Sequence, residues 1–155
     1  MTRLPDVGSV TAELERRGVV LPEGPVRLDA YGDSPALEAE LIGLIRSGKK
    51  RGTSALVWSY EAEGSGLPQA GDIEIVIDSS GSPRLVTRVL FAEVVPFSEV
   101  TEEHAALEGE GDLSLLSWQQ KHWDFFEREC AQIARRATPE MPIVCLQFEL
   151  LSVLS

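Results

Sequence analysis

The sequence is poor in cysteine and histidine. Its 155 residues contain two cysteines, Cys130 and Cys145, and two histidines, His104 and His122. The cysteines form no CxxC pair and the histidines form no HExxH motif, so the spacing typical of a zinc site is absent. We therefore predict two reduced, buried thiols, no bound metal and no cofactor.

Long apolar runs are also missing. No stretch approaches the roughly 18 apolar residues that a membrane-spanning helix needs. The first residues of the chain lack the apolar centre of a secretion signal. These absences predict a protein that has no membrane partner and is located in the cytoplasm.

Basic residues are scarce and unevenly placed. Fourteen Lys and Arg residues face 25 Asp and Glu residues, which gives a formal net charge of −11. Such a chain repels phosphates at long range, so we do not expect it to coat long-duplex DNA. Four of the 14 basic residues nevertheless lie within six positions, at Arg46, Lys49, Lys50 and Arg51. Cations are favoured at the C-terminal end of a helix, which explains Arg46. The other three residues indicate a locally basic pocket.

The apolar pattern alternates between helical and strand-like periods. A helix is predicted to begin at Pro35 and to be capped by Ser34, because leucine and isoleucine recur along one face until Gly48. Further helices are predicted over 10–17 and 113–136, and strands over 53–60, 72–78, 84–95 and 143–153. This order favours an α+β fold in which helices flank a mostly antiparallel sheet or small β-barrel. Residues 1–30 are predicted to be an N-terminal extension packed on a domain of residues 31–155.

Two short motifs carry the chemistry. Gly48-Lys-Lys-Arg-Gly-Thr53 fits the pattern GxKxxT and follows the leucine-rich helix. Thr101-Glu-Glu-His-Ala-Ala-Leu-Glu108 fits the pattern TExHAxxE, and a helix rich in aromatic residues follows it. Over roughly residues 31–151, the chain therefore resembles the ASCH domain superfamily (activating signal cointegrator homology), in particular its longer bacterial members.

This resemblance implies a fold and a set of functions. ASCH domains look like PUA domains, which are small β-barrels with packed helices, and they are associated with RNA. Some short bacterial members hydrolyse the acetyl amide of N4-acetylcytidine with the lysine and threonine of the first motif and the glutamate of the second. The resemblance thus implies Lys50, Thr53 and Glu108 as catalytic residues, and RNA or a modified nucleoside as partner. Two alternatives stay open, a non-catalytic RNA-binding module and a ribonuclease, and no oligomeric state is predicted.

The three residues suit amide hydrolysis. This reaction needs a nucleophile, a base and stabilisation of the oxyanion, and Thr53 offers a hydroxyl for the first task. Lys50 can act as the base only if burial or its cationic neighbours favour the neutral amine. An ion pair with Glu108 favours the ammonium instead. The sequence leaves open which effect prevails.

Five further residues are candidates for ligand or RNA binding: Lys49, Arg51, Trp58, Tyr60 and His104. Trp58 and Tyr60 are predicted on a strand, where they either stack on a base, for about 1–3 kcal/mol, or pack in the core. His104 lies four residues before Glu108, so the two share one face of a helical turn. His122 and the aromatic residues around it are predicted to be core residues.

Overall fold

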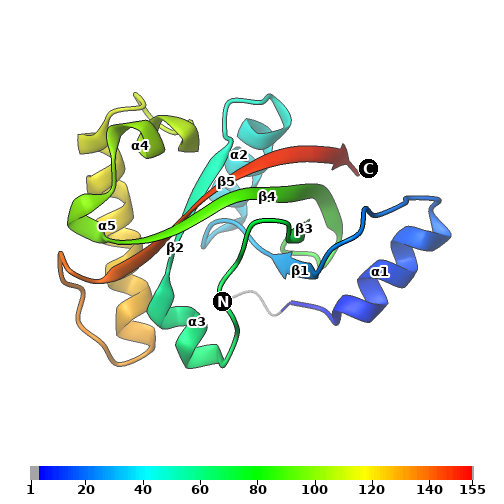
Figure 1. The fold of residues 1–155 in the computed structure, drawn as a ribbon, viewed down its shortest axis with the longest axis horizontal. Coiled ribbons are helices and arrows are strands. Elements are labelled where there is room, and N and C mark those ends of the chain that lie inside the picture. Colours follow the sequence, from blue (N-terminus) through cyan, green and yellow to red (C-terminus); the bar gives the residue numbers. More distant parts are fainter. Residues whose placement is uncertain (1–3, 155) are drawn as a thin grey trace.

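The computed structural model describes residues 4–154, which form one five-stranded sheet with helices around it (Figure 1). Along the sheet, the strands follow the order β1-β3-β4-β5-β2. Their bounds are β1 Val26–Asp29, β2 Gly52–Leu56, β3 Ile73–Ile77, β4 Pro83–Pro96 and β5 Pro142–Val153. Strand β1 is parallel to β3, and the other neighbours are antiparallel. The predicted α+β fold with a mostly antiparallel sheet is confirmed, and the sheet is open rather than closed into a barrel.

Four of the five α-helices of residues 4–154 begin at a residue whose side chain caps the helix. The bounds are α1 Val7–Arg16, α2 Pro35–Arg46, α3 Val57–Glu63, α4 Glu102–Glu108 and α5 Leu115–Gln132, with a 3₁₀ turn η1 at Phe97–Glu99. The side chains of Ser34, Thr101 and Ser114 accept hydrogen bonds from backbone N–H groups in the first turns of α2, α4 and α5. Within residues 4–154, no helix is both long enough and apolar enough to cross a membrane.

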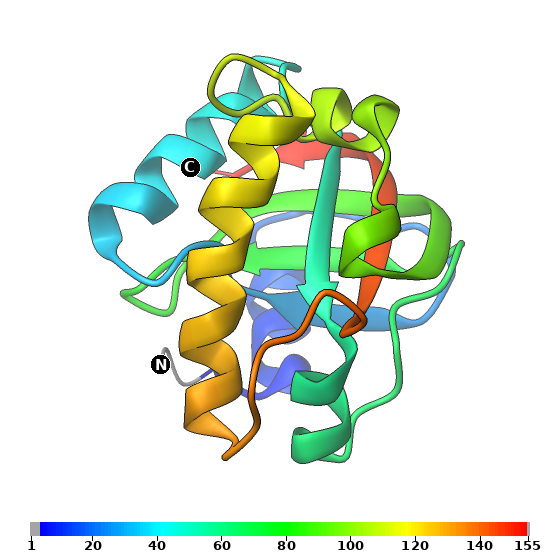
Figure 2. The same cartoon turned by 90° about the vertical axis from the view of Figure 1, so that its left-hand side faces the viewer.

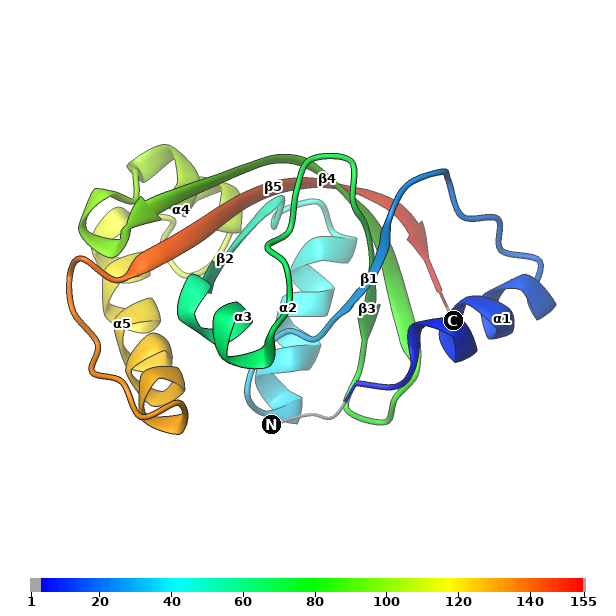
Figure 3. The same ribbon diagram turned by 60° about the horizontal axis from the view of Figure 1, so that its bottom comes forward.

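The two faces of the sheet carry different helices. One face, here called the α2 face, carries Val144, Leu146 and Phe148 of β5 and packs against α2 and α3. Figure 3 shows β4 and β5 arching over these two helices. The opposite face carries Ile143 and Cys145, which pack against α5. Figure 2 shows α5 standing alongside β2, the edge strand.

The N-terminal segment contributes to the sheet. Strand β1 belongs to residues 1–30, the segment predicted as an extension, and pairs with β3 from Val26↔Ile73 to Asp29↔Val76. Helix α1 buries Val10 and Leu14 in one cluster with the isoleucines of β3. The described part of this segment is therefore built into the domain.

The strand predicted over 53–60 is wrong in its second half. Strand β2 ends at Leu56, which pairs with Ile143, because its partner β5 begins at Pro142. The chain then turns into α3, which ends at Gly64 in the left-handed conformation (φ 72°). Trp58 and Tyr60 consequently lie on a helix, not on a strand.

Candidate active site around Glu108

Glu108, the last residue of α4, is 1% exposed and has an unusual number of polar neighbours. A buried carboxylate needs partners, since an unpaired buried charge costs several kcal/mol. Five side chains from four parts of the chain bond to its two oxygens: Lys50, Ser54, His104, Trp118 and His122.

The oxygen Oε1 faces two cations. Lys50 Nζ lies 3.3 Å and His122 Nε2 lies 3.2 Å from it. The ammonium of Lys50 also lies 2.9 Å from Oε2 of Glu110, and Lys50 itself is only 2% exposed. Lys50 thus lies between two carboxylates, and His122 faces one of them.

The oxygen Oε2 has three further hydrogen-bonding partners. The Ser54 hydroxyl donates to it at 2.8 Å, and the Trp118 indole N–H donates at 2.5 Å. His104 Nε2 lies 2.9 Å away, one helical turn before Glu108. The spacing of four residues in the second motif therefore places both side chains on one face of α4.

The backbone holds α4 directly against the first motif. The Arg51 N–H donates to the carbonyl of Leu107 at 2.7 Å. Gly109 follows with φ 68°, and a Cβ there would collide with the Lys49 carbonyl. Only glycine allows this close approach, which brings Lys50 to Glu108.

Electrostatics keep Glu108 ionised. Burial by itself would raise its pKa, but the charge of Lys50 and the hydrogen bonds from His104 and His122 lower the pKa well below the usual 4.5. Glu108 is therefore a carboxylate at neutral pH, and its charge attracts the Lys50 ammonium.

His122 is held as a cation. Its Nδ1 lies 2.9 Å from the Trp118 carbonyl oxygen, and its Nε2 faces Glu108, so both ring nitrogens meet acceptors and both must donate. Burial would lower the pKa of His122, but the hydrogen bond and charge of Glu108 raise it above 6.5. The ring also stacks on the indole of Trp118, with centroids 4.3 Å apart.

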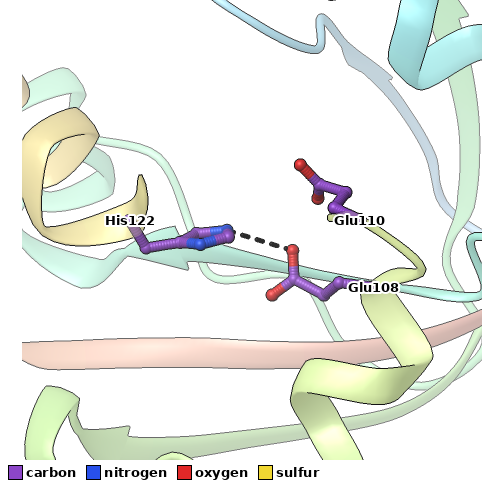
Figure 4. A group of neighbouring side chains, drawn as sticks. All are labelled: Glu108, Glu110 and His122. Carbon is purple, nitrogen blue, oxygen red and sulfur yellow. Dashed lines mark hydrogen bonds and ion pairs between the residues drawn. The ribbon is translucent and has the colours of Figure 1, made fainter. Parts of the chain in front are cut away.

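Three of these residues could hold a metal ion. One ligand atom each from Glu108, Glu110 and His122 lies within 4.8 Å of the others (Figure 4). The Lys50 ammonium already contacts both carboxylates, so a divalent ion would have to displace it. A built-in cation therefore neutralises the acidic residues of this site.

The structure brings some predicted site residues together and separates others. Lys50, Glu108 and His104 meet directly. Thr53 pairs with Leu146 and so lies on the α2 face, whereas Ser54 lies on the opposite face and donates to Glu108. The hydroxyl that donates to Glu108 thus belongs to Ser54, the residue that follows the predicted Thr53.

The remaining candidates form two pairs, Lys49 and Arg51 beside Lys50, and Trp58 and Tyr60 on α3, which follows the other end of β2. Lys49 and Arg51 are exposed on either side of buried Lys50. The guanidinium of Arg135 lies 4.4 Å from the centre of the Trp58 ring, and that of Arg27 lies 5.6 Å from the centre of the Tyr60 ring. A cation therefore already covers each aromatic ring.

The sequence interpretation missed four members of the site: Ser54, Glu110, Trp118 and His122. Trp118 is 4% exposed and packs in the core as predicted, but its N–H reaches Glu108. The signal for His122 was its place four residues after Trp118, which puts both on one face of α5. The two histidines, unremarkable in sequence spacing, converge on one carboxylate.

The fold and this site define a PUA-like α+β domain with a buried lysine–glutamate pair beside its β2 edge. The family model for the ASCH domain matches residues 27–152, and the chain belongs to this family.

Solved structures support the assignment. An ASCH domain from Lactobacillus crispatus JV V101 is 28% identical, with a TM-score of 0.76 over 92% of this chain and 87% of that one. A protein from Enterococcus faecalis V583 is also 28% identical, with a TM-score of 0.76 over 92% of this chain and 85% of that one. No curated protein matches the chain.

Proposed function

We propose that the chain binds a nucleoside-sized ligand beside Lys50 and Glu108 and hydrolyses an amide of a modified nucleoside. The observation that carries the proposal is the buried ion pair between two motifs 58 positions apart. A buried ion pair often stabilises a fold no better than apolar residues of similar volume. Stability alone therefore does not explain the Lys50–Glu108 pair, and its presence supports a functional role. ASCH domains are also associated with nucleic acid binding.

Each residue has a chemical task in this proposal. A hydroxyl, or a water in its place, attacks the amide carbon, and the Lys50 ammonium stabilises the oxyanion that forms. The C–N bond then breaks, and the leaving amine takes a proton from the same ammonium, which regains one from the attacking hydroxyl or water. Where a protein hydroxyl attacks, a water then hydrolyses the resulting ester and restores that hydroxyl. Glu108 holds Lys50 in place. Two hydroxyls are candidates for the nucleophile. Thr53 occupies the position of the nucleophile in the first motif, whereas Ser54 is the residue whose hydroxyl donates to the Glu108 carboxylate.

Incubation with N4-acetylcytidine tests this reaction, with release of cytidine followed by chromatography. We expect turnover by the unaltered chain and a loss of about 10²–10³-fold in Lys50→Met, because one oxyanion donor is removed. Comparing Thr53→Ala with Ser54→Ala identifies the nucleophile, and Lys121→Met, an exposed lysine on α5, is the control. Absence of turnover above the Lys50→Met background would exclude this substrate.

Exposed Lys49 and Arg51 support a second candidate, an RNA-binding module in which they contact phosphate. We expect the affinity for a short single-stranded RNA to fall as salt rises, with a smaller slope in the Lys49→Gln/Arg51→Gln double variant. Fluorescence anisotropy at two salt concentrations measures both slopes. Binding that does not depend on salt contradicts this candidate, and shortened RNA after incubation indicates a ribonuclease.

A further inference from the structure

A second buried polar cluster lies on the α2 face, on β1, β3 and β4. Glu74 of β3 is 2% exposed and pairs in register with Arg27 of β1, while Asp29 lies two residues further along β1. The carboxyl groups of Glu74 and Asp29 share a hydrogen bond. Burial and the Asp29 charge raise the pKa of Glu74 to about 8, so Glu74 carries the shared proton at neutral pH.

Two atoms of this cluster have no hydrogen-bond partner among the described residues. They are Oε1 of Glu74 and Oγ1 of Thr87, a residue that is fully buried. Glu74 and Thr87 lie directly opposite each other on β3 and β4, so both side chains occupy the same face. A buried polar group without a partner lowers the stability of the fold by about 1–3 kcal/mol. Here an acceptor and a hydroxyl without partners among residues 4–154 lie next to each other.

The cluster lies close to the Glu108 site. The Tyr31 ring has its centre 6.0 Å from Lys50 Nζ. Its pKa is raised by burial and by the charges of Asp29, Glu74 and Glu108, so Tyr31 lies within electrostatic range of both groups. The strand register also places Thr53 on the same face of the sheet as Thr87.

The chemistry of the two unpartnered atoms limits what can bind them. Oε1 of Glu74 accepts a hydrogen bond, and the Thr87 hydroxyl is free to donate one. The surroundings hold three carboxyl groups, those of Asp29, Asp72 and Glu129, beside the cation Arg27, and this excess of acidic groups disfavours a phosphate. A neutral ring that presents an N–H donor beside an acceptor fits, as on the polar edge of a pyrimidine base.

We propose that Glu74 and Thr87 form a subsite for the donor–acceptor edge of a pyrimidine base. In this arrangement the base N–H donates to Glu74, Thr87 donates to the adjacent acceptor, and Asp29 holds the Glu74 side chain in place. The inference rests on the proposed function because it assigns the base-binding part of the same ligand site. The side chains are buried, so binding requires a neighbouring segment to move.

Titration calorimetry with cytidine tests the subsite on the full chain. We expect Thr87→Val, which keeps the shape but removes the hydroxyl, to weaken binding about 5- to 100-fold. Thr87→Ser, which keeps the hydroxyl, should bind cytidine within about threefold of the unaltered chain. Glu74→Gln should also bind within about threefold, because its amide can donate to Asp29 and accept from the base. Glu140→Gln, in an exposed turn, is the control. Urea unfolding should show Thr87→Val at least as stable as the unaltered chain.

The outcomes separate the subsite from the reaction. Cytidine binding that depends on Thr87, without hydrolysis of N4-acetylcytidine, supports the subsite and excludes that reaction. Hydrolysis that Lys50→Met abolishes, with cytidine affinity unchanged in Thr87→Val, overturns the subsite alone. If the unaltered chain binds no cytidine, the subsite is overturned together with the nucleoside ligand.

Discussion

Replacing Glu108 with glutamine will lower the free energy of unfolding by about 3–5 kcal/mol, because it leaves the buried Lys50 ammonium without its fully buried partner. The new amide group also brings two N–H donors into a site where every neighbour already donates. Activity towards an amide substrate should fall by about 10²–10⁴-fold, since Lys50 loses the carboxylate that positions it. Urea unfolding and cytidine release measure the two effects.

Glu110→Gln is the matched control for this change. Glu110 makes one ion pair with Lys50 at 2.9 Å, and its side chain is 18% exposed. We expect a loss of stability of about 1 kcal/mol, close to that of a partly exposed pair. If Glu108→Gln unfolds at the same urea concentration as the unaltered chain, the hydrogen bonds to Glu108 do not stabilise the fold.

Raising the pH from about 5 to 8 will destabilise the protein, mainly because Glu74 must ionise. The pKa of Glu74 is raised from 4.5 to about 8, so the folded state binds a proton that the unfolded state releases. Stability from this group is present below pH 4.5 and is lost as the pH rises towards 8, up to a limit of about 5 kcal/mol. The raised pKa values of Asp29, Glu129 and His122 act in the same direction.

Urea unfolding at pH 5, 6, 7 and 8 measures this dependence. In Glu74→Gln, which has no proton to lose, the decline should be clearly smaller, whereas Glu140→Gln should follow the unaltered chain. Lowered pKa values such as that of Glu108 act only below about pH 4.5, outside this window. An equal decline in Glu74→Gln would show that Glu74 ionises as easily in the folded protein as in the unfolded chain.

Local signals predicted the elements that local rules determine. Ser34 and Pro35 identified the start of α2, and the alternating isoleucines identified β3, because caps and periodicity act over a few residues. The Leu-Val-Trp run after Ala55 was misread because its composition suits a strand. Its helical state depends on where β5 begins, at Pro142, which lies far along the chain from Leu56.

The site was predictable only where a motif marked it. Lys50, His104 and Glu108 lie in the two motifs, and the structure places them within hydrogen-bonding distance. Ser54 and Trp118 became visible only after the register of β2 and the packing of α5 were known. Glu74 alternates with isoleucines in the sequence, as on a half-exposed strand, but both faces of β3 are buried, so its carboxyl lies inside the protein.

The stacking of Trp118 on His122 gives the domain an internal optical reporter. The indole contacts a cationic imidazole on its face and a carboxylate at its N–H, so its excited state senses both charges at once. Trp58 and Trp123 lack that carboxylate contact in the described part of the chain. Light emitted by Trp118 therefore depends on the charge state of the site, and ligand entry can be followed without attaching a label.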